Sequence, residues 1–227
     1  MRGIMDYSFI VENTPLYLEA ALLTIKIAAC GIVGSFVVGI VCCLIRELKI
    51  PLLSPLVQVY IELSRNTPLL IQLFFLYFGL PKLGIVWSSE ACGIIGLIFL
   101  GGSYMAEGFR TGIDNVPKIQ RESAYSLGLT GTQTFWKIIL PQAIATSVPV
   151  FCANSIFLLK ETSVFSAVAL ADLMYVTKDL IGLYYKTDEA LLMLVIAYLI
   201  ILLPLSLIST WIERRVRYAG YGNTGTL

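Results

Sequence analysis

The chain has 227 residues, of which 57% are hydrophobic and 14% are charged, and its mean hydropathy is +0.82. A water-soluble domain does not bury that much apolar surface, so the composition predicts a polytopic membrane protein. The formal net charge is +1 without a basic tract, which argues against nucleic acid as a partner. The sequence contains no histidine, the commonest general base, and its cysteines lack metal-site spacing. We therefore expect no catalytic residues and no metal site.

Five segments are long and apolar enough to cross about 30 Å of hydrocarbon, which takes roughly 20 residues each. They cover about residues 16–45, 53–80, 91–109, 142–159 and 190–211. A moderately polar stretch, about residues 169–189, is predicted to be a re-entrant or surface helix. Pro68 removes one backbone hydrogen bond near the start of the second span and predicts a kink there. The predicted fold is all-α, a single membrane domain over residues 1–227 with five transmembrane helices.

The distribution of basic residues predicts the orientation of these helices. With the C-terminus in the cytoplasm, nine Lys or Arg residues lie inside and four lie outside. This ratio favours an external N-terminus and places the segment of about residues 114–141 in the cytoplasm. The cytoplasmic set is Arg46, Lys49, Arg110, Lys118, Arg121, Lys137, Arg214, Arg215 and Arg217, and the external set is Arg2, Lys82, Lys178 and Lys186.

The cytoplasmic segment 114–141 carries the signals of two short helices. Asn115 is a candidate cap for a helix over residues 117–127, which begins at a proline. Gly128 suits the left-handed position that ends such a helix. Thr130 is a candidate cap for a second helix, which is predicted to end before Pro141.

The same segment reads Glu122-Ser123-Ala124, then Gly128, then Ile138 and Leu140-Pro141. This spacing resembles the cytoplasmic loop of ABC importer permeases: Glu-Ala-Ala, three residues, Gly, nine residues, Ile, one residue, Leu-Pro. Only Ser123 departs from it. In that family the loop forms short coupling helices that dock on a separate ATPase. The resemblance implies the type I ABC importer fold and assigns ATPase coupling to Glu122, Ser123, Ala124, Gly128, Leu140 and Pro141.

Three further segments resemble signatures of the polar amino-acid subfamily of these permeases: residues 65–72, 103–113 and 160–163. Asn66, Ser103, Gly108 and Thr111 depart from the usual residues of that subfamily. The resemblance implies a permease subunit of a binding-protein-dependent importer in the plasma or inner membrane. Its expected partners are a second permease subunit, identical or similar, cytoplasmic ATPase subunits, and an extracytoplasmic amino-acid-binding protein.

Several ionisable side chains fall inside the predicted spans. A charge at membrane depth is costly and normally faces a protein interior or a water-filled path. One interpretation is that these residues line the path of a zwitterionic amino acid. The alternative is that the charges pair with one another and either lock the helix packing or form a gate. The candidate path or gate residues are Arg65, Thr67, Gln72, Tyr104, Glu107, Lys160, Glu161 and Thr162.

No phosphate-binding loop of the Gly-x4-Gly-Lys-Ser/Thr type occurs in the sequence. We therefore expect no cofactor on this chain, with ATP and Mg²⁺ bound by a partner ATPase. The alternative function is an ion-coupled secondary transporter of a small polar solute, which would normally have more spans and an internal repeat. The sequence leaves open which amino acid is carried and whether the two permease subunits are identical.

Overall fold

The computed structural model describes residues 5–216, and all secondary structure in this range is helical. The prediction of an all-α fold is therefore confirmed for these residues. Arg2 and Arg217, used in the orientation argument, lie outside the described range. The α-helices are α1 (Tyr7–Glu47), α2 (Leu53–Arg65), α3 (Leu69–Phe74), α4 (Ser89–Asp114), α5 (Lys118–Ser126), α6 (Gly131–Thr134), α7 (Leu140–Glu161), α8 (Leu173–Tyr184) and α9 (Thr187–Val216).

Four helical segments among the described residues are long and apolar enough to cross a membrane. They are Tyr7–Glu47, Ser89–Asp114, Gly131–Val168 and Thr187–Val216. The third of these joins α6, a π-helical turn (Phe135–Ile139), α7 and a 3-10 segment (Thr162–Val168). The predicted re-entrant or surface helix corresponds to α8.

The predicted second span over residues 53–80 is not a single helix. The chain leaves the helix after Arg65 and re-enters it at Leu69, and α3 continues into a π-helical turn (Phe75–Gly79) and a 3-10 turn (Leu80–Leu83). Pro68 has the extended ψ of 141° and has no N–H to continue the ladder from α2. The predicted kink is thus a complete break between two short helices.

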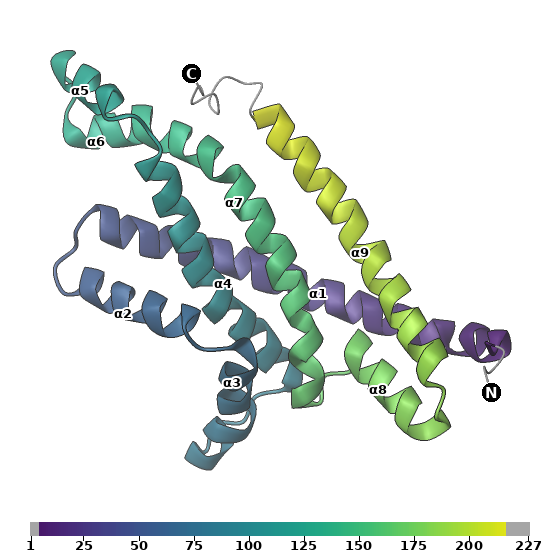
Figure 1. Cartoon of the computed structure of the whole chain (residues 1–227). Coiled ribbons are helices and arrows are strands. Elements are labelled where there is room, and N and C mark those ends of the chain that lie inside the picture. Colours follow the sequence, from purple (N-terminus) through teal and green to yellow (C-terminus); the bar gives the residue numbers. More distant parts are fainter. Residues whose placement is uncertain (1–4, 217–227) are drawn as a thin grey trace.

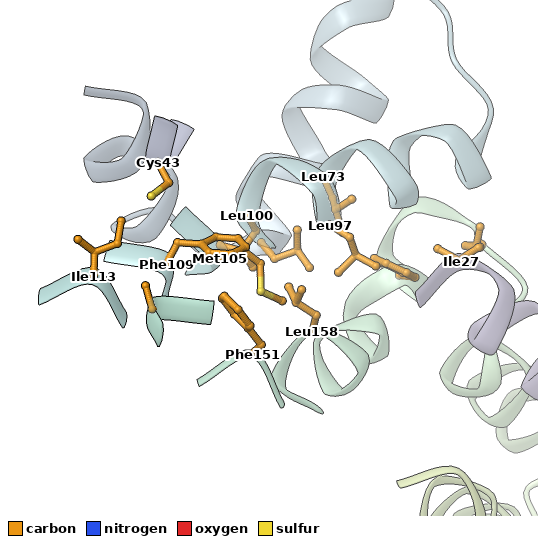
Figure 2. Packing of buried hydrophobic residues seen from close by; sticks show 14 of the residues in the cluster. Ile27, Cys43, Leu73, Leu97, Leu100, Met105, Phe109, Ile113, Phe151 and Leu158 are labelled. Atoms are coloured by element: carbon orange, nitrogen blue, oxygen red, sulfur yellow. The ribbon is translucent and has the colours of Figure 1, made fainter. Parts of the chain in front are cut away.

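The core is centred on α4, which packs along α1 and α7 (Figure 1). Small residues let the backbones of these helices approach closely. A Cβ on Gly101 of α4 would lie 2.2 Å from Ser35 Oγ on α1, so only a glycine fits at this position. The close approach also lets the Ser35 hydroxyl donate to the Leu97 carbonyl of α4 at 3.1 Å. Between α4 and α7 the rings of Phe109 and Phe151 lie 4.4 Å apart, and Figure 2 shows them beside Met105 within the buried cluster.

The two ends of the bundle differ. Figure 1 places α5 and α6 at one end, whereas α8 and the start of α1 lie at the other. At this second end Asp6 caps α1, and its carboxylate accepts a hydrogen bond from Lys186 Nζ at 3.0 Å. Hydrogen bonds from Ser8 and Lys186 lower the pKa of Asp6 below its ordinary value. The Asp6 backbone N–H donates to Glu189 at 2.9 Å. These contacts tie the first turn of α1 to the start of α9.

The helix α8 is also anchored at its N-terminus. Asp172 accepts a hydrogen bond from the Tyr175 backbone N–H at 2.9 Å and is fully buried. One of its carboxyl oxygens, Oδ2, has no partner among the described residues. Burial raises the pKa of Asp172 to about 6, because the charged form loses its hydration.

A further hydrogen bond links α1 to α9: the Tyr17 hydroxyl of α1 donates to the Ala190 carbonyl at 2.8 Å.

Candidate functional site

The first half of the predicted coupling loop is the nine-residue helix α5, within one residue of its predicted bounds. Asn115 does not cap it, contrary to the sequence prediction. Instead the Asn115 N–H donates to the Thr111 carbonyl at 3.0 Å and closes α4, so Pro117 stands at the N-cap of α5. The predicted left-handed conformation of Gly128 is confirmed, with φ of +79°. The backbone N–H of Leu129 donates to the Ala124 carbonyl at 3.1 Å, and this bond accompanies the turn of the chain out of α5.

The second half begins at Thr130, whose predicted capping role is confirmed. The Thr130 side chain accepts from the Gln133 N–H at 3.3 Å, and the Gln133 side chain accepts from the Thr130 N–H at 2.9 Å. The prediction that this helix ends before Pro141 is wrong, because it runs through the π-helical turn Phe135–Ile139 into α7. The widened turn directly precedes Pro141, whose ring and missing N–H interrupt the regular ladder. The loop is therefore continuous with a membrane-spanning helix.

The surface of α5 combines charge with large exposed apolar side chains. Ile119, Tyr125 and Leu127 are 61%, 55% and 82% exposed, although α5 lies outside the four candidate spans. Large apolar side chains left exposed outside the membrane spans, beside charged ones, are typical of a surface that another protein covers. Among the predicted coupling residues, Ala124 is buried beneath the helix. Glu122, Ser123, Gly128 and Pro141 are exposed, and Leu140 lines an apolar cavity of about 170 Å³ at the junction with α7.

A second group of predicted residues converges on Glu107 of α4, whose side chain is 17% exposed. Its carboxylate lies 2.7 Å from Arg46 of α1, 2.7 Å from Arg110 and 3.7 Å from Arg65 of α2. The Arg65 guanidinium also lies 5.2 Å from the centre of the Tyr104 ring. One carboxylate thus holds three guanidinium groups from three helices, and Arg65 pairs with Glu107 as the pairing alternative expects. The same cluster carries net positive charge.

Thr67 and Gln72 lie at the break between α2 and α3. The Gln72 side-chain nitrogen donates to the carbonyls of Ser64 and Thr67, both at 3.0 Å. The Thr67 hydroxyl donates to the Leu63 carbonyl at 2.8 Å. These bonds satisfy carbonyls that the interrupted helix leaves open. In the described structure both side chains therefore stabilise the broken segment.

The remaining predicted path residues lie at the end of α7. Thr162 is fully buried and donates to the Leu159 carbonyl at 2.8 Å, Glu161 is partly buried, and Lys160 is exposed. The 3-10 segment that begins at Thr162 packs against α3. No hydrogen bond or ion pair joins these three residues to the Glu107 cluster among the described residues. The structure therefore separates the predicted path residues into three groups: the Glu107 cluster, the break between α2 and α3, and the end of α7.

Sequence reasoning missed two members of the Glu107 cluster. It used Arg46 and Arg110 only for the orientation of the helices. The i, i+3 spacing of Glu107 and Arg110 is a local signal that predicts their pairing. No local signal connects Arg46 with Glu107, because the contact depends on how α1 passes α4. Among residues 5–216 no three His, Cys, Asp or Glu side chains are grouped as a metal site requires.

The four segments long and apolar enough to cross a membrane, with the helical loop that links α4 to α7, define a helical membrane permease. The chain belongs to the family of binding-protein-dependent transport system inner membrane components, whose model matches residues 31–218. This match confirms the family expected from the sequence, and it does not favour the secondary-transporter alternative.

Relatives and solved structures agree with the family. The chain is 32% identical to a probable amino-acid ABC transporter permease protein, PatM of Vibrio harveyi, over 94% of this chain and 97% of that protein. It is also 32% identical to a probable glutamine ABC transporter permease protein, GlnM of Bacillus subtilis, over 93% and 98%. A crystal structure of an amino acid ABC transporter with histidines superposes with a TM-score of 0.89 at 29% identity, over 94% of this chain and 100% of that one.

Proposed function

We propose that this chain is the permease subunit of an ATP-driven importer that takes up polar amino acids. The two relatives described above, which carry an amino-acid and a glutamine name, match it almost end to end, which supports this class of cargo. The observation that carries the proposal is the set of exposed apolar side chains on α5 and at its C-cap. A helix outside the spans that presents Ile119, Tyr125 and Leu127 to water needs a protein partner to cover it. A separate ATPase subunit is that partner.

The proposed assembly contains two permease subunits that enclose one path, with the N-terminus of this chain outside and its C-terminus in the cytoplasm. An extracytoplasmic binding protein delivers the amino acid, and ATP with Mg²⁺ binds to the ATPase subunits. When ATP binding brings the ATPases together, α5 and α6 move with them. Because α6 is continuous with α7, the movement is applied directly to a membrane-spanning segment. Hydrolysis then resets the assembly.

The Glu107 cluster is proposed as the gate on the path. A zwitterionic amino acid presents one carboxylate and one ammonium group, and both need partners when they leave water. Arg65 reaches Glu107 at 3.7 Å, beyond a close charge-assisted hydrogen bond, and it is 42% exposed. Arg46 and Arg110 hold the carboxylate more closely, at 2.7 Å each. Arg65 is therefore the guanidinium most readily released to a passing carboxylate.

The test is uptake of a labelled amino-acid mixture into vesicles that contain this chain, its ATPase and its binding protein. We expect uptake that requires internal ATP, persists in the presence of an uncoupler, and falls sharply in Glu122→Ala. Asp179→Asn is the matched control, because Asp179 is exposed on α8 at the other end of the bundle. Uptake without ATP that an uncoupler abolishes would instead support an ion-coupled transporter.

A further inference from the structure

The last turn of α1 carries two adjacent charged residues that contact different parts of the molecule. Neighbouring positions on a helix point about 100° apart, so their side chains reach different neighbours. Glu47 lies 3.6 Å from Arg121 of α5, and Arg46 lies 2.7 Å from Glu107 of α4. A single helical turn therefore contacts both the helix proposed to meet the ATPase and the cluster proposed to gate the path.

The contacts of α5 show why this turn matters. Its main contacts with other elements are with α6 and the π-helical turn that follows, both parts of the same loop. Among residues 5–216, the pair of Arg121 with Glu47 is the ion pair that connects α5 to a helix outside that loop. A displacement of α5 thus reaches α1 through this pair.

Helix α1 is suited to carry such a displacement further. It is continuous over 41 residues, which corresponds to about 60 Å. It packs along α4 more extensively than any other pair of described elements. Its opposite end is fixed to the start of α9 by the contacts of Asp6 with Lys186 and Glu189. A shift of the last turn of α1 is therefore transmitted both to Glu107 and to the far end of the bundle.

We propose that Glu47 and Arg46 are positioning residues that transmit movement of the coupling helix to the Glu107 cluster. This inference rests on the proposed function. The Arg121–Glu47 pair is the more exposed of the two, at 41% and 31%, against 25% and 17% for Arg46 and Glu107. Exposed ion pairs contribute little to stability and break readily. The outer pair is thus able to break and re-form during each transport cycle, while the inner pair keeps Glu107 attached to α1.

The experiment measures the number of amino-acid molecules imported per ATP hydrolysed in vesicles containing the full transporter. The variants are Glu47→Gln, Arg121→Gln and the charge-reversed pair Glu47→Arg with Arg121→Glu. Lys49→Gln is the matched control, because Lys49 is an exposed residue two positions beyond Glu47 and has no ion pair among the described residues. Binding of the ATPase to each variant is measured in parallel.

We expect each single variant to lower the import-to-ATP ratio by about fivefold or more, a typical size for coupling between sites. Binding of the ATPase to Glu47→Gln should stay unchanged, because Glu47 lies on α1 outside the proposed docking helix, and the charge-reversed pair should recover most of the ratio. Single variants that keep the wild-type ratio would overturn this inference while leaving the proposed function intact. A wild-type protein whose uptake needs no ATP would overturn both. A purely structural role would lower ATPase binding or yield, without rescue by charge reversal.

Discussion

The close contact of α1 with α4 at Gly39 gives a stability prediction that can be worked out from the coordinates. A Cβ added to Gly39 would lie 2.5 Å from Met105 Cβ and 3.0 Å from the Ala106 backbone nitrogen. Neither atom is the free end of a flexible side chain, so the helices must separate. Overpacking of this kind costs about 1–3 kcal/mol. Replacing a helical glycine by alanine also gains about 1 kcal/mol of helix propensity.

To separate the cost of the clash from the gain in helix propensity, the stability of Gly39→Ala is compared with that of an alanine variant at a glycine without close neighbours. Gly182 of α8 has no heavy atom within 4 Å of its ideal Cβ, so Gly182→Ala should show the propensity gain alone. We expect Gly39→Ala to be about 1–3 kcal/mol less stable than Gly182→Ala. The measurement is the free energy of unfolding in mixed micelles titrated with a denaturing detergent. Equal stabilisation by both substitutions would refute the close approach of α1 and α4.

Two further predictions concern Asp172 and Gly128. The pKa of Asp172 is raised from 3.8 to about 6 in the folded protein. Protonated Asp172 therefore favours the folded state, and this stabilisation, about 3 kcal/mol, is complete below about pH 4 and is lost as the pH rises through 6. Asp172→Asn keeps the cap, so its melting temperature should lack this pH dependence; an unchanged profile contradicts the argument. Gly128→Ala should cost about 1–2 kcal/mol, because its φ is +79°. Unfolding measurements in which Gly128→Ala is as stable as the wild type would contradict this prediction.

The local signals in the sequence predicted local structure well. The bounds of α5, the left-handed Gly128 and the cap at Thr130 each depend on a few neighbouring residues, and each agrees with the structure. Asn115 was misassigned because a polar residue between two helices can close the first as readily as it opens the second. The continuation past Pro141 was missed because this proline falls in the first turn of α7, directly after a π-helical turn, and not in a regular helix interior.

Contacts between distant segments were harder to predict. The pattern of apolar residues over 53–80 is continuous, so it gave one span where the backbone breaks at Pro68 and is stabilised by Gln72. The contacts of Arg46 and Glu47 depend on the crossing of α1 past α4 and α5. Residues about 60 positions apart carry no spacing signal for such a pair. A single sequence therefore identified Glu107 and Arg65 as candidates but not the other two guanidinium groups, those of Arg46 and Arg110.

The central claim is that the loop between α4 and α7 joins this permease to a separate ATPase. The most direct test is the affinity of the purified ATPase for the permease with and without Leu127→Asp. Burying a leucine contributes about 1.5–3 kcal/mol, so the account predicts a loss of roughly tenfold to a hundredfold in affinity. Asp179→Asn on α8 should bind the ATPase as the wild type does. An unchanged affinity of Leu127→Asp, in protein that folds and inserts normally, would contradict the claim.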